Sequence, residues 1–305
     1  MAFLQFSLRK RQAGAVLALL AVVLGVGLAV YPCKRVCSWV EFLTDGHAPP
    51  TFARLTQNAL SRLWHDGFER SIAQCEDETA SAMSAYLTAT RSSTIIEIAA
   101  GGGVAAARWT QMLRKRVGHE DVRLLLTDLQ PNPRAWDRLA AKNEFVSYSN
   151  RSVDATSLGA SLPEIGAQPT LRLVNLALHH FNPSLVQAVF ADAIRTRSAI
   201  LVGDLAPTPG GLLWNWLLAT KYGKPEPSDW HELAELARSE PWWLAFLPLF
   251  PLLAWHDATV SACMATRPPA RPPARPPARP LARLPARAAV LRLVQCNERR
   301  DAAHR

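Results

Sequence analysis

The sequence predicts an α/β protein with a parallel β-sheet covered by helices on both faces. Between residues 94 and 205, short apolar runs alternate with longer helix-like segments, and this alternation is typical of parallel sheets. A turn of three glycines joins the first apolar run to the first helix-like segment. Hydrophobic residues make up 49% of the 305 residues, which is enough for a sizeable core.

Residues 1–36 are predicted to form a membrane anchor. Ala13–Val30 reads AGAVLALLAVVLGVGLAV and contains no charge, and about 20 apolar residues can span a bilayer as a helix. Three basic residues precede this run and two follow it, so the positive-inside rule barely sets its orientation. We expect an uncleaved single-pass signal anchor in an unknown organelle. A cleaved signal or an organellar presequence is the alternative.

Residues 37–90 are predicted to be a helical lead-in. Phe52–Leu63 and Ser71–Leu87 both place apolar residues at a spacing of three to four, which is typical of amphipathic helices.

Residues 91–262 are predicted to form the α/β domain, with five strands and three helices. The predicted strands are Thr94–Ile98, Val122–Thr127, Phe145–Tyr148, Thr170–Leu176 and Ala199–Leu205. The predicted helices are Val104–Val117, Pro131–Lys142 and Ser184–Thr196.

A tryptophan-rich segment follows the fifth predicted strand. Within it, Pro241–Trp255 reads PWWLAFLPLFPLLAW, with three prolines and no charge, so it is too short and too interrupted for an ordinary transmembrane helix. It could pack in the core, line a cavity or touch lipid as an apolar flap.

Residues 263–305 are predicted to be a disordered tail. Arg267–Ala286 repeats RPPA three times and continues RPLA, RLPA, and proline at this density favours polyproline II over helix or sheet. Ten arginines and two acids from residue 267 onward account for +8 of the net charge of +9. The rest of the chain is nearly neutral, so we expect no specific nucleic-acid partner. The five cysteines lack paired spacing, and no metal site is expected.

The glycine turn indicates a nucleotide-like cofactor. Glu97 ends the first apolar run, Gly101, Gly102 and Gly103 form the turn, and Asp128 ends the second run. A turn without bulky side chains lets backbone N–H groups approach a ligand. An acid at the end of the second strand can accept hydrogen bonds from ribose hydroxyls.

Two cofactor classes fit such a turn. A nicotinamide site needs G-x-G-x-x-G, which residues 101–106 match with alanine last. A carboxylate at Glu97 would, however, repel a pyrophosphate, whereas it suits the ammonium of S-adenosyl-L-methionine. Asp154, after the third predicted strand, could accept from an adenine amine. Asn175 lies near the end of the fourth predicted strand, and His179 and His180 follow that strand.

Together these motifs resemble class I S-adenosylmethionine-dependent methyltransferases. The likeness is strongest to an uncharacterised group with LTD-x-x-PN, VDA and HHF-x-P after successive strands. Here the matching segments are Leu126–Asn132, Val153–Ala155 and His179–Pro183. The resemblance implies a Rossmann-like fold with S-adenosylmethionine over the glycine turn. It places Glu97 at the methionine end, Asp128 at the ribose, Asp154 and Ala155 at the adenine, and Asn175 within the cofactor site.

Two departures from that group stand out. Ala99 occupies a position where many of these enzymes have glycine. The Arg-Pro repeat replaces a helix and two last strands, so the sheet is expected to lack them and this chain could be inactive.

The function expected from the sequence is methyl transfer to an unknown, hydrophobic small-molecule acceptor near a membrane. His179 or His180 could act as the general base, or one could pack while the other caps the helix at Asn182. The alternatives are an inactive membrane-tethered scaffold and an NAD(P)-dependent oxidoreductase.

Overall fold

The computed structural model describes residues 49–66, 76–116, 118–166, 169–203, 221–222, 225–249 and 290–293. Ala13–Val30 and most of the Arg-Pro tail lie outside these ranges. Among the residues with described structure, no helix is both long enough and apolar enough to cross a membrane.

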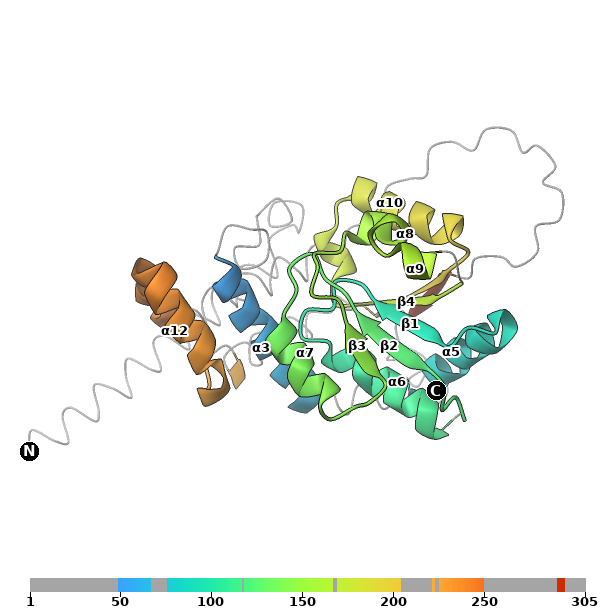
Figure 1. The fold of residues 1–305 in the computed structure, drawn as a ribbon, viewed down its shortest axis with the longest axis horizontal. Helices are drawn as coiled ribbons and strands as arrows, with labels where there is room; N and C mark the ends of the chain where they lie inside the picture. The colour runs from blue at the N-terminus through green and yellow to red at the C-terminus, as the bar shows by residue number, and fades with distance from the viewer. Residues whose placement is uncertain are drawn as a thin grey trace, which may run out of the picture.

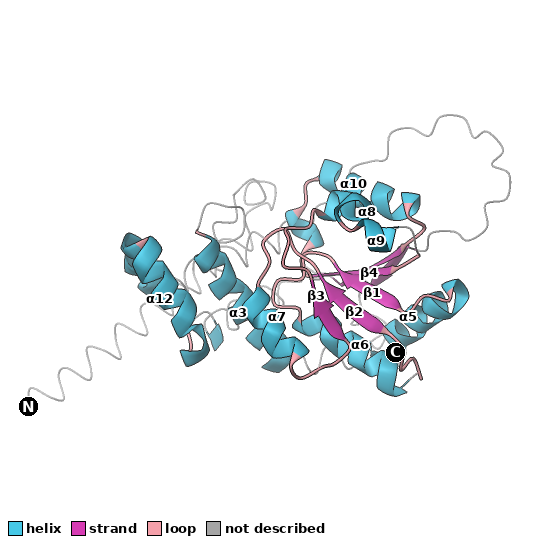
Figure 2. Ribbon diagram, in the orientation of Figure 1, coloured by secondary structure: helices cyan, strands magenta, loops and turns pink. Residues whose placement is uncertain are grey.

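Five parallel strands in the order β3-β2-β1-β4-β5 form a Rossmann-like sheet (Figures 1 and 2). The strands are β1 Thr94–Glu97, β2 Arg123–Leu126, β3 Val146–Tyr148, β4 Leu171–Asn175 and β5 Ala199–Gly203. This confirms the predicted α/β class and all five predicted strands. The order reverses between β1 and β4, so a crevice is expected outside the carboxyl ends of these two strands.

A sixth segment, β6 Val290–Leu293, pairs in parallel with β5. For these four residues the structure differs from the predicted disordered tail, and the sheet does not end at β5 as was expected. The unpaired backbone groups of an edge strand can accept another segment. The segment after the proline repeat therefore adds a strand to the sheet at the position where the last strands were expected to be absent.

Helices cover both faces of the sheet (Figure 1). Three of them confirm the three predicted helices, with bounds α6 Val104–Arg116, α7 Pro133–Ala140 and α10 Pro183–Arg195. The helical lead-in contains α3 Pro50–Asp66 and α5 Glu76–Thr90. Short helical turns follow β3 and β4: η1 Ala155–Ser157, α8 Leu158–Ser161, α9 Pro163–Gly166 and η2 Leu178–His180.

The core is divided by the sheet into two layers because successive strand residues point to opposite faces. Ile95 packs in the layer with α5 and α6, and the next residue, Ile96, packs in the layer with α8 and α10. Both side chains are fully buried. Strands buried on both faces explain why the sequence shows continuous apolar runs and not alternation.

The described part of the tryptophan-rich segment packs against α3. It contains η3 Pro227–Asp229, α12 Trp230–Ser239 and η4 Pro241–Leu249, of which α12 was not predicted. Trp243 is buried, and its ring centroid lies 5.0 Å from that of Phe52 in α3. Within the described part of Pro241–Trp255, core packing thus applies to Trp243, whereas Trp242 is 59% exposed.

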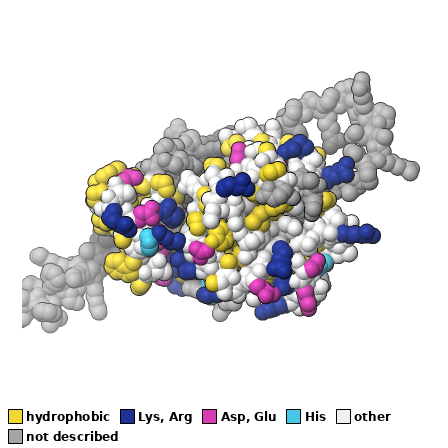
Figure 3. All heavy atoms as spheres, in the orientation of Figure 1, with side chains coloured by type: hydrophobic (Ala, Val, Ile, Leu, Met, Phe, Trp, Pro, Cys, Tyr) yellow, Lys and Arg dark blue, Asp and Glu magenta, His cyan; other side chains and the backbone are white. Residues whose placement is uncertain are grey.

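Charge on the face in Figure 3 is mixed. Lys and Arg side chains lie among acidic and hydrophobic ones, with no continuous basic surface among the described residues on this face.

Candidate functional site

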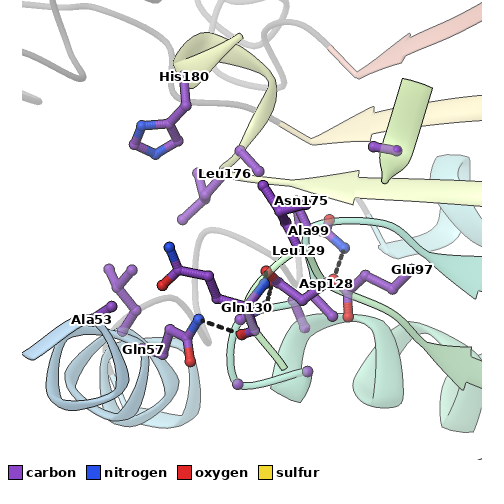
Figure 4. A pocket seen from close by; sticks show the side chains of 18 of the residues that line it. Ala53, Gln57, Glu97, Ala99, Asp128, Leu129, Gln130, Asn175, Leu176 and His180 are labelled. Atoms are coloured by element: carbon purple, nitrogen blue, oxygen red, sulfur yellow. Dashed lines mark hydrogen bonds between the residues drawn. The ribbon is translucent and has the colours of Figure 1, made fainter. Parts of the chain in front are cut away.

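A cavity of about 420 Å³ opens at the carboxyl ends of β1, β2 and β4 (Figure 4). Its size lies in the range of small-molecule sites. Every residue predicted to bind the cofactor lines it: Glu97, Gly101, Gly102, Gly103, Asp128, Asp154, Ala155 and Asn175. The structure thus brings into one place residues that are up to 78 positions apart in the sequence.

Glu97 is the most perturbed group in the cavity wall. Its side chain is 1% exposed, and its Oε1 accepts a 2.8 Å hydrogen bond from Asn175 Nδ2. Its buried Oε2 has no hydrogen-bond partner. Burial raises the pKa of Glu97 from 4.5 to about 8; the Asn175 hydrogen bond opposes this rise, and the Asp128 charge adds to it. A cation beside Oε2 would favour the ionised form.

This pKa predicts an unusual dependence of stability on pH. The folded protein holds a proton on Glu97 that the unfolded chain loses above pH 4.5. The free energy of unfolding should therefore fall as pH rises from about 4.5 to 8. Chemical denaturation of the ligand-free protein across this range checks the prediction, with Glu97→Gln as the control that should lose this part of the slope. Identical pH profiles for the two proteins would contradict it.

Asp128 ties the loop after β2 to the glycine turn. Its Oδ2 accepts from the Gly101 backbone N–H, and its Oδ1 accepts from the Gln130 backbone N–H, each at 2.8 Å. Burial raises the pKa of Asp128, and these backbone donors oppose that rise. Each carboxylate oxygen can accept further hydrogen bonds, so the group could also receive donors from a ligand.

The glycine turn needs its glycines for two reasons. Gly101 and Gly103 have φ of +51° and +73°, the left-handed region that glycine adopts without steric cost. A Cβ on Gly102 would lie 1.6 Å from Ser61 Oγ and 3.2 Å from the Gln57 carbonyl oxygen. Helix α3 therefore rests directly on the turn, which only a residue without a side chain permits.

Ala99, the alanine in place of glycine, also has a left-handed backbone, with φ of +54°. This conformation costs an L-residue about 1–2 kcal/mol, whereas glycine loses about 0.5–1 kcal/mol in backbone entropy. Ala99→Gly is therefore expected to raise the free energy of unfolding by up to about 1 kcal/mol. Urea unfolding at constant pH measures this, and a lower midpoint for Ala99→Gly would contradict it.

Asp154 and Ala155 form the start of η1 at the rim of the cavity. Asp154 is exposed, and its Oδ1 accepts from the Thr156 backbone N–H at 2.8 Å and from Thr156 Oγ1 at 2.7 Å. Asp154 caps the turn in this way, while its other oxygen remains available to solvent or a ligand.

The two histidines differ in position. Both lie in η2 with ring centroids 4.2 Å apart, but only His180 is among the cavity-lining residues. Figure 4 shows His180 across the cavity from Gln57 of α3. Asn182 caps α10 with its own side chain, which accepts from the Leu185 backbone N–H at 2.9 Å. Helix capping at this point is thus performed by Asn182 itself.

Sequence reasoning missed the contribution of α3 to the cavity wall. Six of its residues line the cavity: Ala53, Thr56, Gln57, Leu60, Ser61 and Trp64. The sequence of the helix does show two faces, because buried Phe52, Leu55 and Ala59 mark one, and the other combines small or polar residues with Leu60 and Trp64. The pattern predicts a helix with two faces but does not reveal what the second face contacts.

The site defines a class of fold and not a particular protein. Within the described ranges, no group of three or more His, Cys, Asp or Glu side chains could hold a metal ion. No protein-family model, no curated protein and no solved structure matches the chain. What the structure offers toward a function is therefore its geometry: a Rossmann-like sheet with a cavity, lined by acidic residues and glycines, where the strand order reverses.

Proposed function

We propose that this protein binds S-adenosylmethionine and transfers its methyl group to an apolar small molecule. The observation that carries the proposal is the buried Glu97 carboxyl, which belongs to a residue that lines a cavity of cofactor size and whose Oε2 has no hydrogen-bond partner. An ammonium group would supply both the missing hydrogen bond and the missing positive charge. A dinucleotide pyrophosphate would bring a second negative charge instead.

The remaining wall fits the rest of this cofactor. The glycine turn offers a surface without side chains, directly before the N-terminus of α6. Asp128 keeps free acceptor sites for ribose hydroxyls, and Asp154 could accept from an adenine amine. Asn175 would hold Glu97 in place for the methionine end.

When bound, the cofactor supplies an electrophilic methyl group. The protein's own contribution would then be to place the acceptor's nucleophilic atom in line with it and to exclude water, which accounts for most of the rate gain in such displacements. His180 is the histidine that could take a proton from that atom, because it lines the cavity. His179 is excluded from the cavity lining and would support the position of His180 through ring contact.

The proposed acceptor is apolar because of the cavity mouth. Leu60, Leu129 and Leu185 line the cavity and yet are 40%, 63% and 42% exposed. Phe181 adds an aromatic side chain to this rim. Exposed hydrophobic groups around a cavity are typical of binding sites for apolar ligands. An acceptor drawn from a membrane would agree with the anchor expected for Ala13–Val30.

Asp128→Ala is expected to weaken S-adenosylmethionine binding by about 1–3 kcal/mol, because ribose hydroxyls would lose a partly buried acceptor. Isothermal titration calorimetry measures the change. Asp137→Ala is the control, since Asp137 is exposed and lies outside the cavity lining. Equal affinities for Asp128→Ala and the unaltered protein would remove Asp128 from the proposed site.

A further inference from the structure

Gly203, at the end of β5, lies beside the cavity without lining it. The register of the sheet pairs Gly203 with Asn175 of β4. Its backbone carbonyl accepts a 2.7 Å hydrogen bond from the Leu176 N–H. The backbone of Gly203 is therefore fixed against the segment that carries Asn175.

The missing side chain of Gly203 makes room for the Asn175 amide. A Cβ at position 203 would lie 2.9 Å from Asn175 Oδ1, closer than real Cβ contacts allow. The same amide donates from Nδ2 to Glu97 Oε1 at 2.8 Å (Figure 4). An amide group is rigid and planar, so pushing its oxygen away also moves its donor nitrogen.

We propose that Gly203 is a positioning residue: by lacking a side chain it lets Asn175 hold the Glu97 carboxylate in place in the cavity wall. This inference rests on the proposed function for its consequence in cofactor binding. The chain of contacts from Gly203 through Asn175 to Glu97 is itself independent of the ligand's identity. Gly203 does not line the cavity, and two of its contacts, the Asn175 amide and the Leu176 N–H, belong to residues that do. A double variant with Asn175 separates the two routes.

The test compares Gly203→Ala, Asn175→Ala and the double variant by titration with S-adenosylmethionine. Gly203→Ala is expected to weaken S-adenosylmethionine binding roughly tenfold, which is the usual effect of losing one hydrogen bond to a charged group. In the Asn175→Ala background the same change should cost nothing, because the clashing oxygen is gone. Gly159→Ala is the matched control: its Cβ would lie 3.0 Å from Thr196 Cγ2, away from the cavity.

A second measurement works without any ligand. Because the Asn175 hydrogen bond lowers the pKa of Glu97, Gly203→Ala should move the pH-dependent step in unfolding upward by about one pH unit. Gly159→Ala should leave that step in place. If the unaltered protein bound no S-adenosylmethionine but this shift occurred, the proposed function would fail and the role of Gly203 would stand. Additive effects of the two substitutions on binding, or an unshifted pH step in Gly203→Ala, would overturn it.

Discussion

Replacing Glu97 with glutamine is expected to weaken S-adenosylmethionine binding by about 10- to 100-fold, the usual effect of losing a hydrogen bond between charged groups. Glutamine has nearly the same shape, so it can keep the contact between Oε1 and Asn175. It lacks the negative charge that an ammonium group would need. Calorimetric titration near pH 8, where ionised Glu97 is well populated, gives the largest difference.

The same substitution should stabilise the ligand-free protein at alkaline pH. Burying a polar group without enough partners costs roughly 1–3 kcal/mol, and glutamine removes the ionised form that carries this cost. The free energy of unfolding at pH 9 should therefore rise while binding falls, an opposition typical of functional sites. Glu232→Gln is a matched control, because Glu232 is equally buried but lies outside the cavity. If both variants changed binding equally, Glu97 would have no special role.

Gly102→Ala is expected to lower both the stability of the protein and its affinity for S-adenosylmethionine. The added carbon would lie 1.6 Å from Ser61 Oγ and 3.2 Å from the Gln57 carbonyl oxygen, so the Ser61 hydroxyl must rotate away and α3 must shift slightly from the turn. Overpacking of this kind costs about 1–3 kcal/mol of stability. Binding should also weaken about tenfold or more, since one misplaced backbone donor leaves a hydrogen bond unmade. Thermal unfolding and titration measure the two effects.

A second substitution separates the clash from other causes. Ser61→Ala removes the hydroxyl and leaves Ser61 Cβ as the next neighbour, 3.0 Å from the added carbon. The double variant should regain part of both stability and affinity, because a contact at this distance requires only a small shift. Ser61→Ala alone removes the hydrogen bond to the Gln57 carbonyl and should have a small effect. No recovery in the double variant would show that α3 does not rest on Gly102 as described.

The sequence was sufficient for the sheet because its strands are short apolar runs buried on both faces. It was also sufficient for Glu97 and Asp128, since parallel strands place their carboxyl-terminal residues at one edge. The sequence was insufficient for features that depend on how the elements pack against one another. His179 and His180 are neighbours in the chain, and only the direction of η2 separates the one that lines the cavity from the one that does not.

Gly203 and α12 were missed for related reasons. The role of Gly203 depends on a neighbour from another strand, Asn175, and no pattern within β5 indicates it. Helix α12 carries an amphipathic pattern, but it lies in a segment dominated by tryptophan and proline, and its first residue, Trp230, is 67% exposed. The pairing of β6 with β5 likewise depends on an edge that only the folded sheet presents.

The most direct test of the proposed function is calorimetric titration of the full chain, solubilised in detergent, with S-adenosylmethionine and with NAD. We predict saturable binding of S-adenosylmethionine, tighter at pH 8 than at pH 6. Titration at pH 7 in buffers of different ionisation enthalpy should show release of about one proton per ligand, as Glu97 ionises beside the ammonium. NAD should not bind. Binding of NAD with no binding of S-adenosylmethionine, or S-adenosylmethionine binding without pH dependence, would contradict this account of Glu97 and its cavity.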